Sequence, residues 1–225
     1  MNKGKINDFI SKERFLPYLL KHENDFDKAI QHYESNIIIS EAFYPLLSIL
    51  EVSLRNKINL LFKIKYKTNE WFEHPEFIKT GSSFQIKRVT EARNSILRSK
   101  KTITSGKIIS ELTFGFWTSL FDSRFEMFLW KQLRLCFPNC EKRQRKRKTL
   151  SSRLNTIRKF RNRVFHYECI SWDFDVLQNF ADDIIETIKW LDKDLLLWGQ
   201  SIFRVNDVIE QEKNKLSNYK AVLDL

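Results

Sequence analysis

The segment with the richest chemistry is residues 158–166, which read Arg-Lys-Phe-Arg-Asn-Arg-Val-Phe-His. It ends on His166, and histidine is the side chain that exchanges a proton near neutral pH without a large pKa shift. Arg161 supplies a permanent cation that can pair with phosphate oxygens through two hydrogen bonds. These two groups suit metal-independent RNA cleavage, in which the substrate's own 2′-OH is the nucleophile. Such a reaction leaves a 2′,3′-cyclic phosphate and a 5′-OH.

The spacing of these residues places them at the end of one helix. Asn162 and His166 are four residues apart and therefore share a helix face. Arg161 lies about 140° around the helix from His166, and its long side chain can bend toward the same cleft. A plainer interpretation is that His166 caps a helix C-terminus, where a positive charge is stabilising by about 0.3–1 kcal/mol.

Positive charge is concentrated around this motif. The 225-residue chain has 39 Lys and Arg against 28 Asp and Glu, a net charge of +11. Residues 142–163 contain eleven basic and no acidic residues, so this segment accounts for the whole net charge. A local basic block predicts a polyanion-binding surface. We expect salt-sensitive contacts with an RNA backbone from Lys142, Arg143, Arg145, Lys146, Arg147, Lys148, Arg153, Arg158, Lys159 and Arg163.

The composition predicts an all-α protein. Only 5 Gly and 4 Pro are present, too few for the frequent turns of a β-sandwich or barrel. Aromatic residues make up 14% of the chain, which excludes intrinsic disorder. Apolar residues recur at helical spacing in segments 6–21, 25–62, 83–98, 105–112, 149–165, 173–198 and 206–219. We expect one helical domain over residues 1–225, with the tract 142–148 leading into the helix of about 149–165.

Proline and loop residues should interrupt this pattern. Pro17 should bend or restart the first helix, and Pro45 should kink or break the second. The pattern stops around residues 71–81, where His-Pro and Thr-Gly-Ser-Ser mark a loop, and residues 102–106 form another turn.

Four ordered segments resemble the Abi-like (abortive infection) proteins of the HEPN superfamily. Arg161-Asn162-x3-His166 is similar to the superfamily's Arg-x4-6-His signature. Residues 50–56 resemble its early Leu-Glu-x2-Leu-Arg-Asn helix, and residues 111–117 its central Phe-Gly-Phe-Trp motif. Trp130 followed by Phe-Pro at 137–138 fits the stretch after it. The resemblance covers about residues 36–200.

The resemblance implies a HEPN-type helical bundle with additional helices and a homodimer with a composite cleft of two Arg and two His. Catalytic members are endoribonucleases, often toxins that arrest growth or block phage infection. Carried over, Arg161 stabilises the transition state, His166 acts as general acid/base, and Asn162 orients the motif by hydrogen bonding. RNA is the expected partner, with an antitoxin as a further possible one.

Residues 51–56 have two interpretations. Glu51 and Arg55 are four residues apart with the acid first, an ion pair worth about 0.2–0.5 kcal/mol on a helix. Alternatively, Glu51, Arg55 or Asn56 lies beside the cleft and supports Arg161 as part of a second layer. The aromatic segment 114–117 is expected to fill the core rather than to stack on RNA.

No metal, cofactor or membrane contact is expected. Cys136, Cys140 and Cys169 form no CxxC pair, and zinc ligation by His166 would remove its proton chemistry. No nucleotide-binding glycine motif is present. The longest uncharged apolar stretch, residues 42–50, has nine residues, against about 18 for a membrane span, and no signal peptide precedes it. These features predict a cytoplasmic protein.

The sequence therefore predicts a metal-independent HEPN endoribonuclease, acting as a toxin or in abortive-infection defence against phage. The alternative is a non-catalytic RNA-binding regulator that holds a structured RNA through the same basic face. His166 favours catalysis, because another Arg or Lys would serve phosphate binding equally well.

Overall fold

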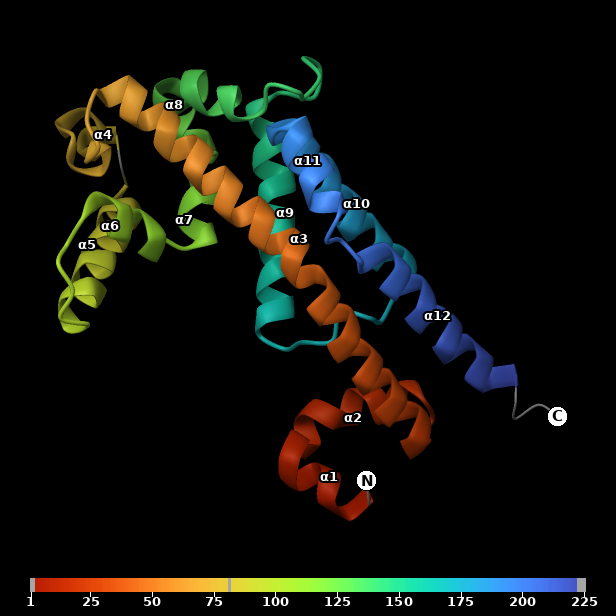
Figure 1. Ribbon diagram of the computed structural model, residues 1–225. Coiled ribbons are helices and arrows are strands. Elements are labelled where there is room, and N and C mark those ends of the chain that lie inside the picture. The colour runs from red at the N-terminus through yellow and green to blue at the C-terminus, as the bar shows by residue number, and fades with distance from the viewer. Residues whose placement is uncertain (1–2, 81, 222–225) are drawn as a thin grey trace. The chain divides into compact units, whose positions relative to one another are not determined.

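The computed structural model describes residues 3–80 and 82–221, with the backbone alone for residues 3, 4, 7 and 218–221. These residues form twelve α-helices and no β-strand (Figure 1). The all-α prediction is thus confirmed.

The chain folds as two compact units, each assembled from separate segments. Unit 1 contains residues 1–46, 160–182 and 201–225, and unit 2 contains residues 47–159 and 183–200. Three helices contribute residues to both units: α3 (Phe26–Tyr66), α9 (Arg147–Phe165) and α10 (Phe174–Leu191).

In unit 1, α1 (Lys3–Ile10) and α2 (Lys12–Lys21) precede α3, and α12 (Val205–Ala221) closes the unit. The helical conformation is interrupted between α1 and α2 at Ser11, which has a φ of 67°. The Ser11 hydroxyl caps α2 by accepting a hydrogen bond from the Arg14 amide. Pro17 lies inside α2, so the helix does not restart at Pro17: the new helix begins earlier, after the Ser11 cap.

Aromatic side chains form the core of unit 1. Phe15, Tyr18 and Phe26 are buried in a cluster that includes residues of α1 and α2, so the first 30 residues are part of this unit. Phe160 anchors the end of α9, because its ring stacks on Phe180 at 4.2 Å and meets Phe43 edge-on at 4.8 Å.

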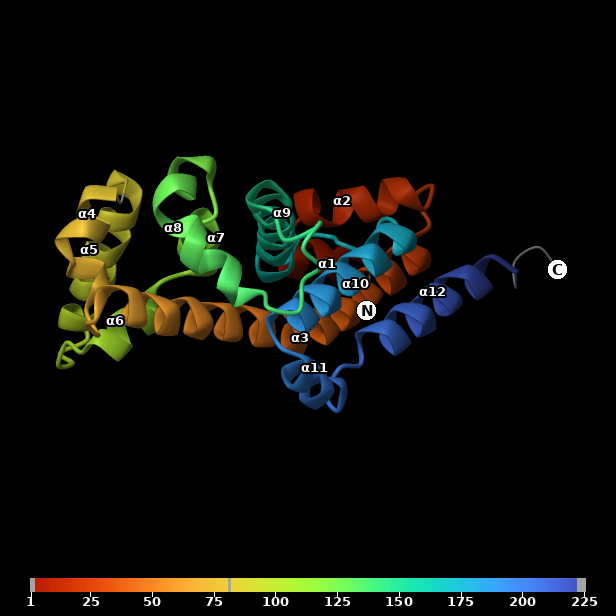
Figure 2. The same ribbon diagram turned by 90° about the horizontal axis from the view of Figure 1, so that it is seen from above.

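Unit 2 consists mainly of short helices around two buried tryptophans. Trp71 and Trp117 have no exposed surface. Their indole N–H groups donate to Asn59 Oδ1 and to the Leu112 carbonyl, as buried indoles require. Figures 1 and 2 show α4, α5 and α6 side by side at one end of this unit. Besides its parts of the three shared helices, unit 2 contains α4 (Pro75–Thr80), α5 (Ser83–Arg98), α6 (Ser105–Glu111), α7 (Phe114–Ser119), α8 (Glu126–Leu133) and α11 (Lys193–Gln200).

Several predicted boundaries are confirmed and others are corrected. α5 spans residues 83–98 as predicted, and the Asp25 carboxylate caps α3 through the amides of residues 27 and 28. α3 does not end at Pro45. The segment 71–80 contains a 3-10 turn and α4 rather than only loop, and Gly81 lies outside the described residues. The helix expected over 173–198 is two helices, because the Asp192 carboxylate caps a new one.

α3 is long and apolar enough to cross a membrane, a property that core helices of soluble proteins share. Its most apolar 18-residue window is 44% buried inside the structure.

Candidate active site

The last turn of α9 carries the Arg-Asn-x3-His motif, entirely within unit 1. The His166 amide donates to the Asn162 carbonyl at 2.9 Å, and the side chain of His166 is exposed. Tyr167 then adopts a φ of 59°, and hydrogen bonds from Tyr167 to Val164 and from Glu168 to Arg163 complete a Schellman cap. His166 therefore occupies the C-cap position, beyond which the helix ends abruptly.

Arg161 is half-buried on this turn. Its guanidinium carbon lies 4.2 Å from the centre of the Phe165 ring, a cation–π contact one helical turn along the chain. This contact restricts the rotamers of Arg161 before any anion binds. A pre-oriented cation stabilises developing charge more effectively than one that must reorganise.

Two side chains far away in sequence hold the loop after His166. Arg14 of α2 donates to the carbonyl of Tyr167 at 2.8 Å and to that of His166 at 3.4 Å. Asn36 of α3 is buried, accepts from the Ile170 amide at 2.8 Å and donates to the Glu168 carbonyl at 3.3 Å. The backbone from His166 to Ile170 is therefore held by side chains of α2 and α3.

A buried histidine extends this support. His32 Nε2 lies 3.1 Å from both the carbonyl and the hydroxyl of Ser171, and His32 Nδ1 lies 2.9 Å from His22 Nε2. Burial, more than the nearby positive charge, lowers the pKa of His32 to about 4. His32 is therefore neutral at pH 7 and serves as a structural hydrogen-bonding group in unit 1.

A cavity of about 720 Å³ opens beside the motif, within unit 1. The two chain neighbours of His166, Phe165 and Tyr167, form part of its wall, and Arg14 borders it as well. The rest of the lining is mostly apolar and comes from α1, from α3 and from Val164 of α9. His166 itself is not among the lining residues, but both of its chain neighbours are.

The side chains of Arg163 and Asn162 differ in their hydrogen-bond and ion-pair partners. Arg163 donates to the Cys169 carbonyl at 2.5 Å and pairs with Glu168 at 3.5 Å, so it serves the loop. The half-buried Asn162 side chain has no hydrogen-bond partner within the described ranges. Its predicted orienting role stays a prediction.

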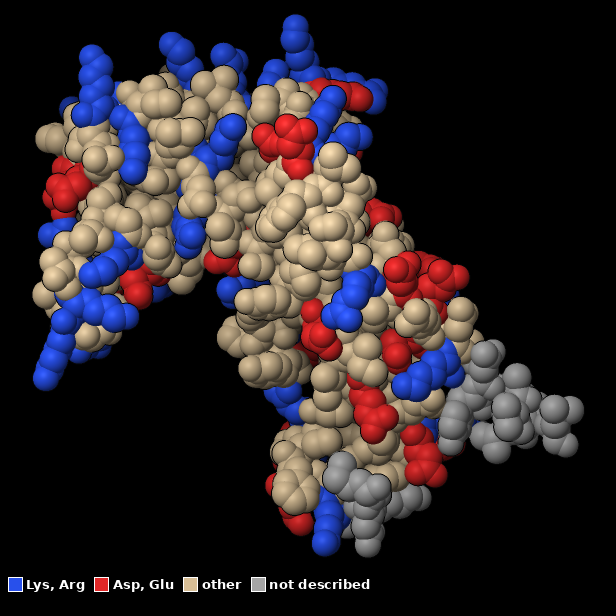
Figure 3. Space-filling view, in the orientation of Figure 1, with Lys and Arg blue, Asp and Glu red and all other residues tan. Residues whose placement is uncertain are grey.

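The excess of basic over acidic residues lies in unit 2. That unit contains 27 basic and 13 acidic residues, whereas unit 1 contains 12 basic and 15 acidic residues. Figure 3 shows Lys and Arg side chains projecting from the unit-2 surface near α4 and α8. Unit 2 is therefore the part of the chain suited to a polyanion.

Several predicted RNA-binding arginines have structural partners in unit 2. Arg153 pairs with Asp183 and Glu186 and lies 4.4 Å over the Trp190 ring. Arg147 pairs with Glu126 at 2.7 Å. Among the others, Arg143 pairs with Glu141, and Arg145 donates to the carbonyls of Phe137 and Pro138.

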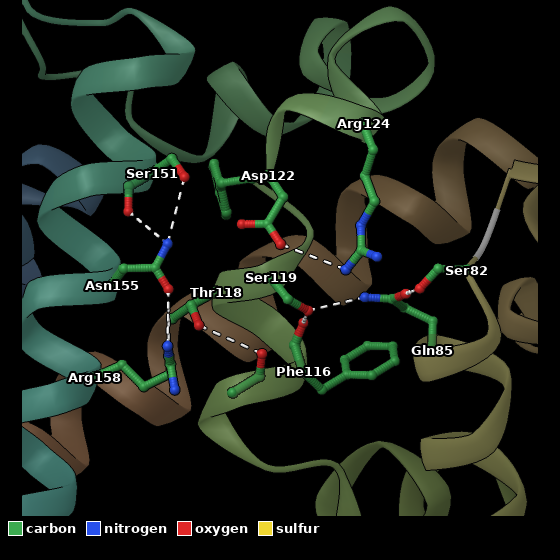
Figure 4. A network of polar contacts seen from close by, with 12 residues as sticks. Ser82, Gln85, Phe116, Thr118, Ser119, Asp122, Arg124, Ser151, Asn155 and Arg158 are labelled. Carbon is green, nitrogen blue, oxygen red and sulfur yellow. Dashed lines mark hydrogen bonds and ion pairs between the residues drawn. The ribbon is translucent and has the colours of Figure 1, made fainter.

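Arg158 is committed to a chain of polar contacts along α9 (Figure 4). It donates to Asn155, which in turn donates to the Ser151 carbonyl at 3.0 Å. A Cβ on Gly115 would lie 3.7 Å from Arg158 Cδ, so the Phe-Gly-Phe-Trp segment and α9 are in close contact. Phe114, Phe116 and Trp117 are buried, as expected for core residues. The exposed members of the basic set are Lys142, Arg143, Lys146, Lys148 and Lys159.

The residues expected to support the cleft lie in unit 2. Glu51, Arg55 and Asn56 follow one another along the second half of α3, and Arg55 Nε donates to Asn56 Oδ1 at 3.4 Å. Arg161, Asn162 and His166 belong to unit 1. The supporting role of Glu51, Arg55 and Asn56 stays a prediction.

The cysteines are separated between the units and buried or half-buried. Cys136 and Cys140 lie in unit 2 and Cys169 in unit 1, and burial raises the pKa of all three thiols. Within residues 3–80 and 82–221 no cluster of three or more His, Cys, Asp or Glu side chains could hold a metal ion.

Sequence reasoning did not identify Arg14, Asn36 or the aromatic wall of the cavity. Arg14 is 153 residues from its partner Tyr167, and one basic residue in an amphipathic helix carries no signal of such a contact. The sequence gives a weak indication that Asn36 has a buried polar role, since it is a polar residue that interrupts an apolar helix stripe.

No family model, curated protein or solved structure matches this chain.

Proposed function

We propose that the protein is a metal-independent endoribonuclease of the HEPN type. The observation that supports it best is the end of α9, where an exposed histidine occupies a C-cap held by Arg14 and Asn36. Arg161, one turn earlier, is oriented by Phe165. A fixed cation beside an accessible imidazole matches the needs of phosphodiester cleavage by a substrate hydroxyl.

In this mechanism the 2′-oxygen of the RNA attacks the adjacent phosphorus, and the bond from phosphorus to the 5′-oxygen breaks. One imidazole accepts the proton of the 2′-OH, and an imidazolium donates a proton to the departing 5′-oxygen. Arg161 neutralises the charge that builds on the non-bridging oxygens. The products are a 2′,3′-cyclic phosphate and a 5′-OH.

Two proton-transfer groups are needed, and each chain offers one histidine at the motif. A homodimer would bring two copies of His166 and two of Arg161 to one cleft, so that one histidine serves as base and the other as acid. In this proposal the chain forms a HEPN-type helical bundle and works as a cytoplasmic toxin or antiphage protein, restrained by an antitoxin.

The test is RNA cleavage in EDTA by the purified protein, with chemical mapping of the product ends. We expect cyclic-phosphate products from the wild type, and at least a thousandfold loss in His166→Ala and Arg161→Ala. His74→Ala, which removes a half-buried histidine in unit 2, is the matched control and should cleave normally. Equal rates in wild type and His166→Ala would refute the proposal.

A second candidate is a non-catalytic RNA-binding regulator. The excess of basic residues in unit 2 favours it, because phosphate binding needs no histidine. Tight, salt-dependent RNA binding by both wild type and His166→Ala, without cleavage by either, would support this function instead.

A further inference from the structure

We infer that the cavity of about 720 Å³ in unit 1 is a nucleobase pocket, which holds one base of the RNA next to the bond that is cleaved. The inference rests on the proposed function for its biological substrate, but the pocket is testable as a binding site by itself. Its volume lies in the usual range of small-molecule sites, about 300–1,000 Å³.

The wall of the cavity offers stacking surfaces. Tyr44 of α3 and Phe165 of α9 are 6.1 Å apart between ring centres, tilted by 42°, and 58% and 37% exposed. Exposed rings are unfavourable in water, and a planar base is the natural group to cover them, because every base has a π face. Tyr33 and Tyr167 add two further rings to the same wall.

The polar groups of the wall point to a ligand with hydrogen-bonding edges. Ser40 Oγ is buried and has no hydrogen-bond partner among the described residues. An unsatisfied buried hydroxyl costs about 1–3 kcal/mol, and a base amino or carbonyl group would satisfy it. Glu41, by contrast, pairs with Arg204 at 3.1 Å, so the acidic group on the wall is partly neutralised.

The position of the cavity ties it to the chemistry. Phe165 lines the cavity and also lies against the Arg161 guanidinium, and Tyr167 lines it and follows His166 in the chain. Arg14 borders the cavity while holding the His166 loop. A base against Phe165 would therefore carry its ribose and phosphate near the cationic end of α9. Occupancy of the pocket would select which phosphodiester is presented.

The experiment measures direct binding of the four nucleoside 3′-monophosphates by isothermal titration calorimetry, with ribose 5-phosphate as the probe without a base. We expect at least one nucleotide to bind and ribose 5-phosphate not to bind at the same concentration. Tyr44→Ala should weaken nucleotide binding by about fivefold or more. Ser40→Ala should change the preference among the four bases without loss of stability. Phe128→Ala removes a ring that is 52% exposed on α8 and should change nothing.

Each result separates the pocket from the catalytic proposal. Nucleotide binding lost in Tyr44→Ala supports the pocket whether or not His166→Ala abolishes cleavage. Equal binding of ribose 5-phosphate and nucleotides, or unchanged binding in Tyr44→Ala, would overturn the pocket while leaving the nuclease proposal intact. Light scattering provides a further test: a dimer that becomes a monomer in Tyr44→Ala would assign this face to a second copy of the chain and overturn the inference.

Discussion

The Arg14 guanidinium lies 2.8 Å from the carbonyl oxygen of Tyr167, a contact across 153 positions of the chain. Tyr167 is the first residue after the candidate catalytic His166, and its carbonyl would otherwise have no partner in the helix. Helix α2 thus contributes to the geometry of a motif that lies about 150 positions later in the sequence.

Arg14→Ala should lower RNA cleavage by about five- to tenfold, because it removes hydrogen bonds worth about 1 kcal/mol from the His166 loop. The loss should fall on kcat rather than on KM, since Arg14 acts on the backbone of the loop. Steady-state kinetics with a short fluorogenic RNA measure this. Lys213→Ala, which removes an exposed cation paired with Asp175 in the same unit, should keep the wild-type kcat. An equal loss in both variants would contradict a positioning role.

Tyr167→Gly should raise the free energy of unfolding by about 1 kcal/mol. Tyr167 has a φ of 59° at the C′ position of α9, where a side chain is strained and glycine is preferred. Urea denaturation measures the change. Tyr167→Ala keeps the strain and should give no such gain, so equal stabilisation by Gly and Ala would show that the backbone conformation is not the cause.

The stability of the protein should fall as the pH drops from about 6.5 to about 4. Burial lowers the pKa of His32 to about 4, below its unfolded value of about 6.5, so the unfolded state binds the proton first. The contribution is fully present above pH 6.5 and is lost as the pH falls through this window, up to about 3 kcal/mol. Urea titrations between pH 4 and pH 8 measure the slope. His32→Gln should flatten it, and an unchanged slope would exclude His32 as its origin.

Replacing the three exposed lysines Lys142, Lys146 and Lys148 with Gln should weaken RNA binding and reduce the salt slope by about 2, since each phosphate contact contributes about 0.7. Fluorescence anisotropy at several salt concentrations measures this. The matched control replaces Lys87, Lys100 and Lys101, which are exposed elsewhere in unit 2, and should leave a steeper slope. Identical salt slopes in both triple variants would show that only net charge matters.

Arg153→Ala should act differently and lower the free energy of unfolding, because it breaks two ion pairs.

The sequence by itself determined the helical character of the chain, several helix ends and the position of the motif. These features are local: Asp25 and Asp173 cap the helices that follow them through amides two and three residues away. The Arg161-to-His166 spacing and the basic block are likewise readable without a fold. The break at Ser11 rather than at Pro17 was missed, because a serine cap and a tolerated proline give similar sequence patterns.

Only the tertiary structure decided which side chains surround the motif and which Lys and Arg side chains are exposed for binding an anion. Arg14, Asn36 and Tyr44 reach it through packing of α2 and α3 on the end of α9 within unit 1. Arg153 and Lys148 look alike in the sequence, yet one is bound between two carboxylates and the other is exposed. Helix periodicity records which face of a helix is apolar, but the partner of a polar side chain depends on residues far away in the chain. That information exists only once the helices have packed.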